Sequence, residues 1–358
     1  MVICGCQVTA GDCFSYLHWR YLCSCDRRKL DVSIGKHYSA EISGGCFNSL
    51  RNSFGSKKLS EAMPNLKSID TWLEGVREYI AVQAPEILGV LDLYMGEARF
   101  GRKYIDSDLA TISSTATILE VGAGSLLLSC QLVREGFQVS ALEPLGDGFS
   151  HFDKLRNLIL EHARITGCVP TLLNLPAEKL SVNSFFDYAF SINVMEHVND
   201  MPGVVVKVSN ALKNGARYRF TCPNYLFPYE PHFNIPTLFS KKLTEHFFAG
   251  KIFGRQDVPD PVGTWKSLNW ITVPLVVSGV KKVPDLHVRF NKKLLVSTIE
   301  RVATDPQFSA RRSKSMRTVL SALVALRLHS LFALIPATLQ PIIDCTITKN
   351  PNVIGKTS

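Results

Sequence analysis

Two glycines and a following glutamate have the types and spacing needed to bind a nucleotide. Gly122 and Gly124 come directly after a short apolar run, Ile118–Val121. Glycine tolerates a positive φ and lets the backbone approach a ligand closely. Glu143 ends the next apolar run and lies 143 − 120 = 23 positions after Glu120. Because open parallel sheets bind ligands beyond the carboxyl ends of their strands, we expect the glycine turn and Glu143 to face one crevice.

Such a crevice suits a nucleoside. A carboxylate accepts hydrogen bonds from both ribose hydroxyls, and the N–H groups at the start of the following helix attract an anion. The dinucleotide pattern Gly-x-Gly-x-x-Gly requires a glycine where this chain has Leu127. That glycine permits close packing around a pyrophosphate, so its absence weighs against NAD or FAD. An NAD(P)-linked oxidoreductase and a noncatalytic nucleotide-binding module remain as alternatives.

A second group of polar residues follows the fourth and fifth apolar runs of this region. Residues 193–198, Asn-Val-Met-Glu-His-Val, come directly after the run at 186–192. The run at 217–221 leads to Cys-Pro-Asn-Tyr and then to His232. Because both runs read as parallel strands, both polar segments are expected at the same carboxyl edge as the glycine turn.

These segments resemble known motifs. Glu120-x-Gly122-x-Gly124 with Glu143 resembles motif I and the following acidic position of the Rossmann-fold (class I) S-adenosylmethionine (SAM) methyltransferases. The family often has a further glycine where this chain has Leu126.

The later segments point to one group within this family. Residues 186–198 resemble motif IV of the methyltransferases related to ubiquinone-biosynthesis O-methyltransferases. Pro-Asn at 223–224, His232 and residues 239–243 resemble the next block of that group. The resemblance covers roughly residues 118–243.

The resemblance implies SAM as the cofactor and methyl transfer as the activity. The family's glycine loop receives the methionyl end of SAM and its acid holds the ribose, which implies these roles for the loop and for Glu143. A loop after the third strand passes beside adenine. The cofactor-binding residues that the resemblance implies are Glu120, Gly122, Ala123, Gly124, Glu143, Ala177, Glu178, Ser191, Ile192 and Asn193.

The histidines are the candidate catalytic residues. Imidazole titrates near neutrality, so we predict that His197 or His232 accepts a proton from a hydroxyl of a small or lipid-linked acceptor. Some relatives bind a divalent metal with Glu-x-x-Glu-His and a later histidine, which correspond to Asn193, Glu196, His197 and His232. Because Asn193 replaces an acid, Mg²⁺ would bind weakly, and we predict no metal. Glu196 and His197 would then be a helix-start acid and a pocket wall.

Alternating apolar runs and helical patterns predict the fold class. The expected strands are 118–121, 139–142, 171–174, 186–192 and 217–221, with a turn at 145–148. The expected helices are 126–136, 152–165 and 204–212, the last closed by Lys213-Asn214-Gly215 as a C-cap. We therefore predict an α/β protein with a doubly wound, mostly parallel Rossmann-like sheet, helices on both faces and helical additions at both ends.

Four regions are expected along the chain. Residues 1–56 show no sustained period and predict a loosely ordered extension. Residues 57–110 form a helical cap, with helices through Trp72–Gln83 and from Glu86 to about Met95. Residues 111–245 form the SAM-binding core. Residues 246–358 complete the sheet, with Val280–Phe290 and Cys345–Lys349 as the family's last, antiparallel strands, and add an apolar helix.

Composition limits the remaining functions. The 358 residues are 46% apolar and 20% charged, which is typical of a globular protein. The net charge of +9 comes from dispersed basic residues, with one compact cluster at 311–317, so nucleic acid is not an expected partner. Cys130, Cys168 and Cys222 lie among apolar residues and predict buried thiols in a reducing compartment. No signal sequence is evident, and the cytoplasm is the expected location.

The C-terminal third leaves two features open. Trp265 and Trp270 belong either to the core or to an acceptor pocket, and the core is the favoured interpretation. Residues 318–335 are nearly all apolar but too short and too interrupted to span a bilayer. They fit a core helix best. The alternatives are a dimer face and an interfacial helix, in which residues 311–335 contact a membrane peripherally.

Overall fold

The computed structural model describes residues 68–350, except for 145–149, 239, 257, 259 and 311. All of these residues belong to the second of the chain's two compact units, Lys67–Ser358. The extension predicted at 1–56 and the turn predicted at 145–148 lie outside the described residues, and the predicted region boundaries remain predictions.

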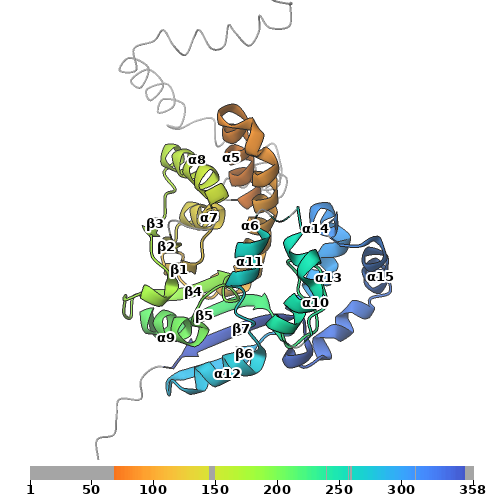
Figure 1. Cartoon of the computed structure of the whole chain (residues 1–358). Coiled ribbons are helices and arrows are strands. Elements are labelled where there is room, and N and C mark those ends of the chain that lie inside the picture. The colour runs from red at the N-terminus through yellow and green to blue at the C-terminus, as the bar shows by residue number, and fades with distance from the viewer. Residues whose placement is uncertain are drawn as a thin grey trace, which may run out of the picture. The chain divides into compact units, whose positions relative to one another are not determined.

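A seven-stranded sheet forms the centre of the described unit (Figure 1). Its strands are β1 (Thr117–Val121), β2 (Gln138–Leu142), β3 (Thr171–Leu173), β4 (Phe186–Ile192), β5 (Leu212–Pro223), β6 (Leu286–Phe290) and β7 (Ile342–Lys349). Their order is β3-β2-β1-β4-β5-β7-β6. The first five strands are parallel, and β7 runs antiparallel between β5 and β6. The predicted mostly parallel sheet is confirmed. The inserted antiparallel strand separates it from the 3-2-1-4-5-6 order of dinucleotide-binding enzymes.

Helices cover both faces of the sheet, as predicted (Figure 1). The helices that follow the parallel strands are α7 (Leu127–Glu135), α8 (Ser150–Thr166) and α9 (Met201–Ala211). Leu119 and Val121 of β1 belong to the same core cluster as α9 and α12 (Val273–Lys281). Ile118 belongs to the cluster that α7 and α6 (Leu88–Leu109) line on the other face. Since neighbouring side chains of a strand point to opposite faces, this alternation accounts for the two layers.

One group of added helices precedes the sheet, and the other lies between β5 and β7, so that the described chain ends with a strand and not with the predicted C-terminal helical addition. At the N-terminal end, α5 (Ile69–Gln83), the short 3-10 helix η1 (Pro85–Ile87) and α6 precede β1. The α6 helix is longer than expected because an amphipathic pattern continues to Leu109. The remaining elements are η2 (Ala177–Lys179), α10 (Lys241–Phe253), α11 (Pro261–Ser267), α13 (Leu294–Thr304), α14 (Pro306–Ala310), α15 (Lys314–Ala325), η3 (Leu328–Leu334) and η4 (Ala337–Leu339).

Two predicted boundaries were wrong. Residues 213–215 do not cap α9, because the helix ends at Ala211 and Leu212 already has extended φ and ψ of −75° and 143°. Leu212 is fully buried and pairs with Phe186 of β4, so tertiary packing overrides the local C-cap pattern. Residues 280–290 are not one strand either, since α12 continues to Lys281 and β6 begins at Leu286.

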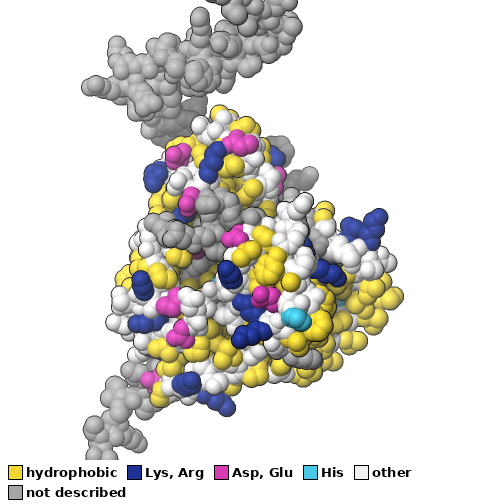
Figure 2. All heavy atoms as spheres, in the orientation of Figure 1, with side chains coloured by type: hydrophobic (Ala, Val, Ile, Leu, Met, Phe, Trp, Pro, Cys, Tyr) yellow, Lys and Arg dark blue, Asp and Glu magenta, His cyan; other side chains and the backbone are white. Residues whose placement is uncertain are grey.

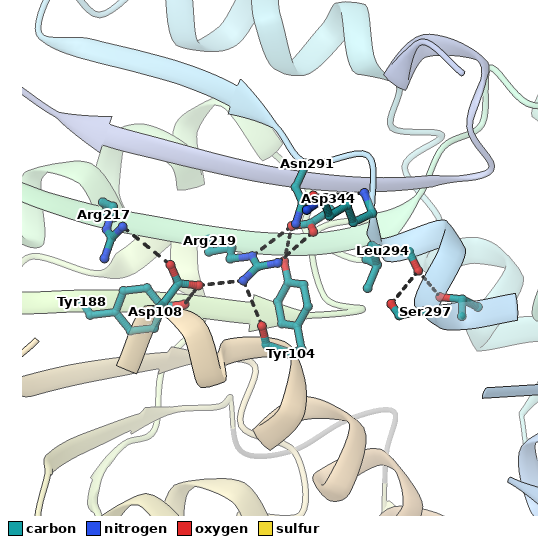
Figure 3. A network of polar contacts seen from close by, with 11 residues as sticks. Tyr104, Asp108, Tyr188, Arg217, Arg219, Asn291, Leu294, Ser297 and Asp344 are labelled. Atoms are coloured by element: carbon teal, nitrogen blue, oxygen red, sulfur yellow. Dashed lines mark hydrogen bonds and ion pairs between the residues drawn. The ribbon is translucent and has the colours of Figure 1, made fainter. Parts of the chain in front are cut away.

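A buried polar network ties the antiparallel strand to the rest of the sheet (Figure 3). Arg219 of β5 donates two hydrogen bonds to Asp344 of β7, at 3.0 and 2.9 Å. It also donates to Asp108 at 2.7 Å and to the carbonyl of Tyr104 at 2.9 Å, both on α6. Its guanidinium lies 4.0 Å from the centre of the Tyr104 ring. Since every polar group of this buried cluster has a partner, the network holds α6, β5 and β7 in one arrangement.

The favoured prediction of a core helix at 318–335 was wrong. No residue of α15 is buried, and the chain bends by 91° between α15 and η3. Arg327, at the bend, has a left-handed φ of 57°. Among the described helices, none is long and apolar enough to cross a membrane alone. Only the combined length and composition of α15 and η3 would be sufficient.

Candidate active site

The turn between β1 and α7 has the backbone conformation for which glycine is suited. Gly122 and Gly124 have φ of +73° and +48°. The N–H groups of Gly122 and Ala123 donate to the carbonyl of Leu142, at 2.7 and 3.2 Å, which fixes the turn against the end of β2. Leu126, the N-cap of α7, has a φ of 67°. The left-handed conformation is therefore present at the position where the family often has glycine.

Glu143 lies against this turn. Its Oε2 accepts a hydrogen bond from the Gly124 N–H at 3.0 Å, and its own N–H donates to Leu173 of β3. Burial raises the pKa of this half-buried carboxyl, and the hydrogen bond from Gly124 opposes the shift. The acid after β2 and the glycines after β1 thus meet at one edge of the sheet, as the spacing predicted.

Glu120 lies deeper than its neighbours. Its side chain is 7% exposed, and the hydroxyl of Ser129 on α7 donates a hydrogen bond to it. Burial raises its pKa to about 8. The carboxyl therefore joins β1 to α7 beneath the glycine turn.

The other predicted cofactor residues lie on two neighbouring segments. Ala177 is buried at the start of η2, and Glu178 accepts a hydrogen bond from the Asn199 N–H at 2.9 Å. Ser191 is buried and its hydroxyl is bonded with that of Tyr218 inside the core, so only its backbone can face the crevice.

The end of β4 is closer to the rim. Ile192 is partly buried and Asn193 is exposed. Asn193 has a left-handed φ of 54°, and its N–H donates to Thr221 of β5 at 2.8 Å. The next residue, Val194, contacts the glycine turn: a Cβ added at Gly122 would lie 2.3 Å from Val194 Cγ2. The segment after β4 and the turn after β1 therefore touch.

Glu196, His197 and His232 form a cluster beside this contact. Each residue has one potential metal-ligand atom in the cluster, and these three atoms all lie within 4.8 Å of one another. The centres of the two imidazole rings are 5.4 Å apart. The structure thus brings together both predicted catalytic histidines. Both carboxyl oxygens of Glu196 are buried and have no hydrogen-bond partner among the residues that the structure describes. Burial raises the pKa of Glu196 to about 7.

The two histidines differ in their surroundings. Nδ1 of His232 lies 2.6 Å from Oε1 of Glu230, a fully buried acid. Burial lowers the pKa of His232, but the hydrogen bond and charge of Glu230 outweigh it, so the pKa is raised. Nδ1 of His197 lies 2.8 Å from the hydroxyl of Ser267. Burial and the charge of His232 lower the pKa of His197 to about 4.

Sequence reasoning missed Glu230. Besides holding His232, this carboxylate accepts from the hydroxyl of Tyr225 at 3.2 Å and from the N–H of Phe233 at 2.7 Å. The spacing Glu-x-His, two residues apart after the fifth strand, was the available signal. A buried acid that fixes one imidazole nitrogen leaves the other as the reactive one.

Both tryptophans of this region belong to the core, as favoured. Trp265 is buried, and Trp270 is partly buried, packs against the same core cluster and stacks on Tyr225 with ring centres 4.4 Å apart. The Trp270 backbone has a left-handed φ of 58°, which is costly for a bulky residue. Its indole N–H is buried and has no hydrogen-bond partner among the described residues. Asn269 joins this segment to the catalytic cluster by donating its backbone N–H to the carbonyl of Glu196 at 2.8 Å.

The donor set of this cluster fits a transition metal better than magnesium. Two imidazoles and one carboxylate are the ligands that Fe²⁺, Mn²⁺ or Zn²⁺ accept, whereas Mg²⁺ prefers oxygen. Among the described residues, neither carboxyl oxygen of Glu196 has a hydrogen-bond partner, so both are available to a cation. The residues present therefore could hold a metal.

The sheet order and the glycine–acid contact match those expected of the predicted Rossmann-fold (class I) SAM-dependent methyltransferase. No family model matches the chain. It is 45% identical over 281 residues to "Uncharacterized protein Rv1509" of Mycobacterium tuberculosis, across 78% of this chain and 95% of that protein. The chain belongs to the same family as that protein.

Three further similarities are partial or distant. The chain is 34% identical over 118 residues to the ubiquinone biosynthesis O-methyltransferase of Paramagnetospirillum magneticum, across 33% of this chain and 43% of that protein. Phosphoethanolamine N-methyltransferase 2 of Haemonchus contortus, solved with SAM, has a TM-score of 0.42 and 16% identity over 70% of this chain and 52% of its own. An S-adenosylmethionine-dependent methyltransferase from Mesorhizobium loti has a TM-score of 0.42 and 12% identity over 67% and 95%.

Proposed function

We propose that this protein transfers the methyl group of SAM to an oxygen atom of a small or lipid-linked acceptor. The observation that carries the proposal is the hydrogen bond between Gly124 and Glu143, which places a carboxylate against an open glycine turn at the carboxyl edge of the sheet. A nucleoside with a free ribose and an amino-acid end suits this combination of groups.

The residues around the turn would hold the cofactor. Glu143 would accept hydrogen bonds from the ribose hydroxyls, since Oε2 alone is tied to Gly124. Space is open beside Gly124, where an added Cβ would have no atom within 4 Å. Ala177 and Asn193 would line the base-binding side. When bound, SAM supplies a methyl group that its sulfonium makes electrophilic.

His232 is the proposed general base. In the neutral form of His232, with Nδ1–H donating to Glu230, Nε2 can accept the proton of an acceptor hydroxyl. Because the pKa of His232 is raised, this neutral form becomes more abundant as the pH rises. The hydroxyl oxygen would then be the nucleophile toward the methyl group that SAM supplies, and S-adenosylhomocysteine would be the second product. His197, whose lowered pKa keeps it neutral near pH 7, would orient the acceptor.

Two unpartnered polar groups of this region, one of them beside His232, support an oxygen-rich acceptor. Buried polar groups are normally hydrogen-bonded, so each exception needs an explanation. The carboxyl of Glu196 and the indole N–H of Trp270 both lack a partner in the described residues. An acceptor with a hydroxyl donor and a second oxygen would satisfy both, which supports an oxygen-rich acceptor over an apolar one.

Calorimetric titration of the purified protein with SAM, S-adenosylhomocysteine and NAD tests the cofactor. We expect saturable binding of the first two and none of NAD. Binding of NAD alone would favour an oxidoreductase, and no binding of any of the three would favour a noncatalytic module. Mass spectrometry of ligands retained through purification would identify candidate acceptors.

Variants of the two histidines test the base. With an acceptor in hand, His232→Ala should lower kcat by about 10²-fold or more, and Glu230→Gln should lower it less. His197→Ala is the matched control and should mainly raise the acceptor KM. Full turnover in His232→Ala would contradict the assignment. A divalent metal that co-purifies with the protein and is lost in His232→Ala would assign this residue as a ligand instead.

A further inference from the structure

Apolar side chains are exposed along α15, η3 and η4. We call this surface the apolar flank and define it by Met316, Val319, Leu326, Leu328, Leu331, Leu334 and Leu339. Their exposed fractions run from 40% for Met316 to 75% for Leu334. Figure 2 shows hydrophobic side chains gathered on the side where Figure 1 places α15, with Lys and Arg side chains above them.

The flank residues come from consecutive elements. Met316 and Val319 lie three residues apart on α15, and Leu326 is its C-cap. The helix packs against α13, and Leu320 and Val324 are only partly buried. After the bend at Arg327, η3 continues with Leu328, Leu331 and Leu334. Exposed apolar groups in this number and proximity mark an interaction surface more than ordinary surface residues do.

The charge of the same segment is one-sided. Between Asp305 and Asp344 the chain has no acidic residue, and it has five basic ones, Arg311, Arg312, Lys314, Arg317 and Arg327. Residues 306–343 thus carry a net charge of +5, whereas the whole chain carries +9. Lys314 and Arg327 are exposed at the two ends of α15. Apolar side chains edged by cations match the interface of an anionic bilayer, where the acyl region and the phosphates are adjacent.

We propose that the apolar flank docks on an anionic lipid surface, with α15 and η3 lying in the interface and not across it. The 91° bend between the two helices and their short lengths suit a surface position. A second copy of the chain fits less well, because a symmetric contact would bring two sets of like charges together without any acid from this segment to pair them.

The end of the flank is tied to the segment that follows β5. The side chain of Asn224, which directly follows β5, donates to the carbonyls of Thr338 and Gln340 at 3.1 and 2.8 Å. The segment that ends the flank is thereby fixed to the carboxyl edge of the sheet. Where the proposed function holds, docking would bring that edge close to lipid-linked acceptors. Docking itself needs no methyl transfer.

Sedimentation of the full chain with lipid vesicles tests the proposal. We expect binding to phosphatidylcholine vesicles that contain phosphatidylglycerol, and at least about tenfold weaker binding to phosphatidylcholine alone. The double variant Val319→Asp/Leu326→Asp should bind the anionic vesicles at least about tenfold less well. Lys314→Glu/Arg327→Glu should lose the preference for anionic lipid.

A matched control comes from exposed apolar residues elsewhere. Val82 and Ile165, on α5 and α8, are 80% and 71% exposed, and Val82→Asp/Ile165→Asp should bind vesicles as the unmodified protein does. SAM titration of the same samples separates a loss of docking from a loss of the proposed function. Equal binding of both flank variants and the unmodified protein would overturn the proposal. The proposal would also be overturned if analytical ultracentrifugation without lipid showed a dimer and the Val319→Asp/Leu326→Asp variant dissociated it.

Discussion

Adding one methyl group at Gly122 should disturb the cofactor crevice more than adding one at Gly124, although both residues belong to the same turn. At Gly122 the new Cβ would lie 2.3 Å from Cγ2 and 2.7 Å from Cγ1 of Val194. At Gly124 it would meet no atom within 4 Å. Both residues have a positive φ, so both alanine variants carry backbone strain. Only the variant at Gly122 adds a steric clash.

The expected magnitudes follow from these two effects. A left-handed conformation costs a residue with a Cβ about 1–2 kcal/mol. Overpacking in a tight contact adds about 1–3 kcal/mol. Gly122→Ala should therefore lower the free energy of unfolding by about 2–5 kcal/mol, and Gly124→Ala by about 1–2 kcal/mol. Val194→Ala removes the two closest atoms and should recover about 1–2 kcal/mol in the Gly122→Ala background.

Urea denaturation monitored by circular dichroism measures these differences, and calorimetry on the same proteins measures SAM binding. Gly124→Ala should weaken SAM binding strongly for a small loss of stability, because its Cβ would enter the open crevice. Equal destabilisation by the two glycine variants, with no recovery from Val194→Ala, would refute the contact between the turn and the segment after β4.

Three further outcomes are expected. Trp270→Phe keeps the ring stack but removes the unpartnered N–H, so stability should rise by about 1 kcal/mol while the acceptor KM increases about tenfold. The pKa of Glu120 is about 8 in the folded state and about 4.3 in the unfolded state. Between pH 5 and 8 the folded state therefore keeps a proton that the unfolded state has lost, and the free energy of unfolding should fall by up to about 1.4 kcal/mol per pH unit. Glu120→Gln should flatten that dependence in pH-resolved denaturation. Asp344→Ala leaves the buried Arg219 without its main partner and should cost about 3–5 kcal/mol in urea denaturation, whereas Lys213→Ala, at an exposed ion pair, should cost less than about 1 kcal/mol.

The sequence predicted the first half of the sheet well because its signals are local. The Ile118–Val121 run, the two glycines and the stop at Gly136 each lie within one βαβ unit, and Gly136 does end α7 with a left-handed φ of 112°. Glu143 could be placed opposite the turn because parallel strands of similar length bring their carboxyl ends together.

The errors arose where distant contacts decide the structure. Residues 213–215, Lys-Asn-Gly, have the composition of a helix end. They belong to β5 instead, because Leu212 is buried and pairs with β4. Residues 318–335 have the composition of a core helix, yet no residue of α15 is buried in the described part of the chain. The stacking of Trp270 on Tyr225 joins residues 45 positions apart, so no local sequence pattern could predict it.

The sharpest test of the account is calorimetric titration of SAM into Glu143→Ala beside the unmodified protein. Glu143 accepts one hydrogen bond from Gly124 and is proposed to accept the ribose hydroxyls with its remaining capacity. Losing hydrogen bonds to a charged acceptor costs about 1.5–3 kcal/mol, so SAM should bind about 10- to 100-fold more weakly. Unchanged SAM affinity in a folded Glu143→Ala protein would contradict the claim that this acid and the glycine turn form the cofactor site.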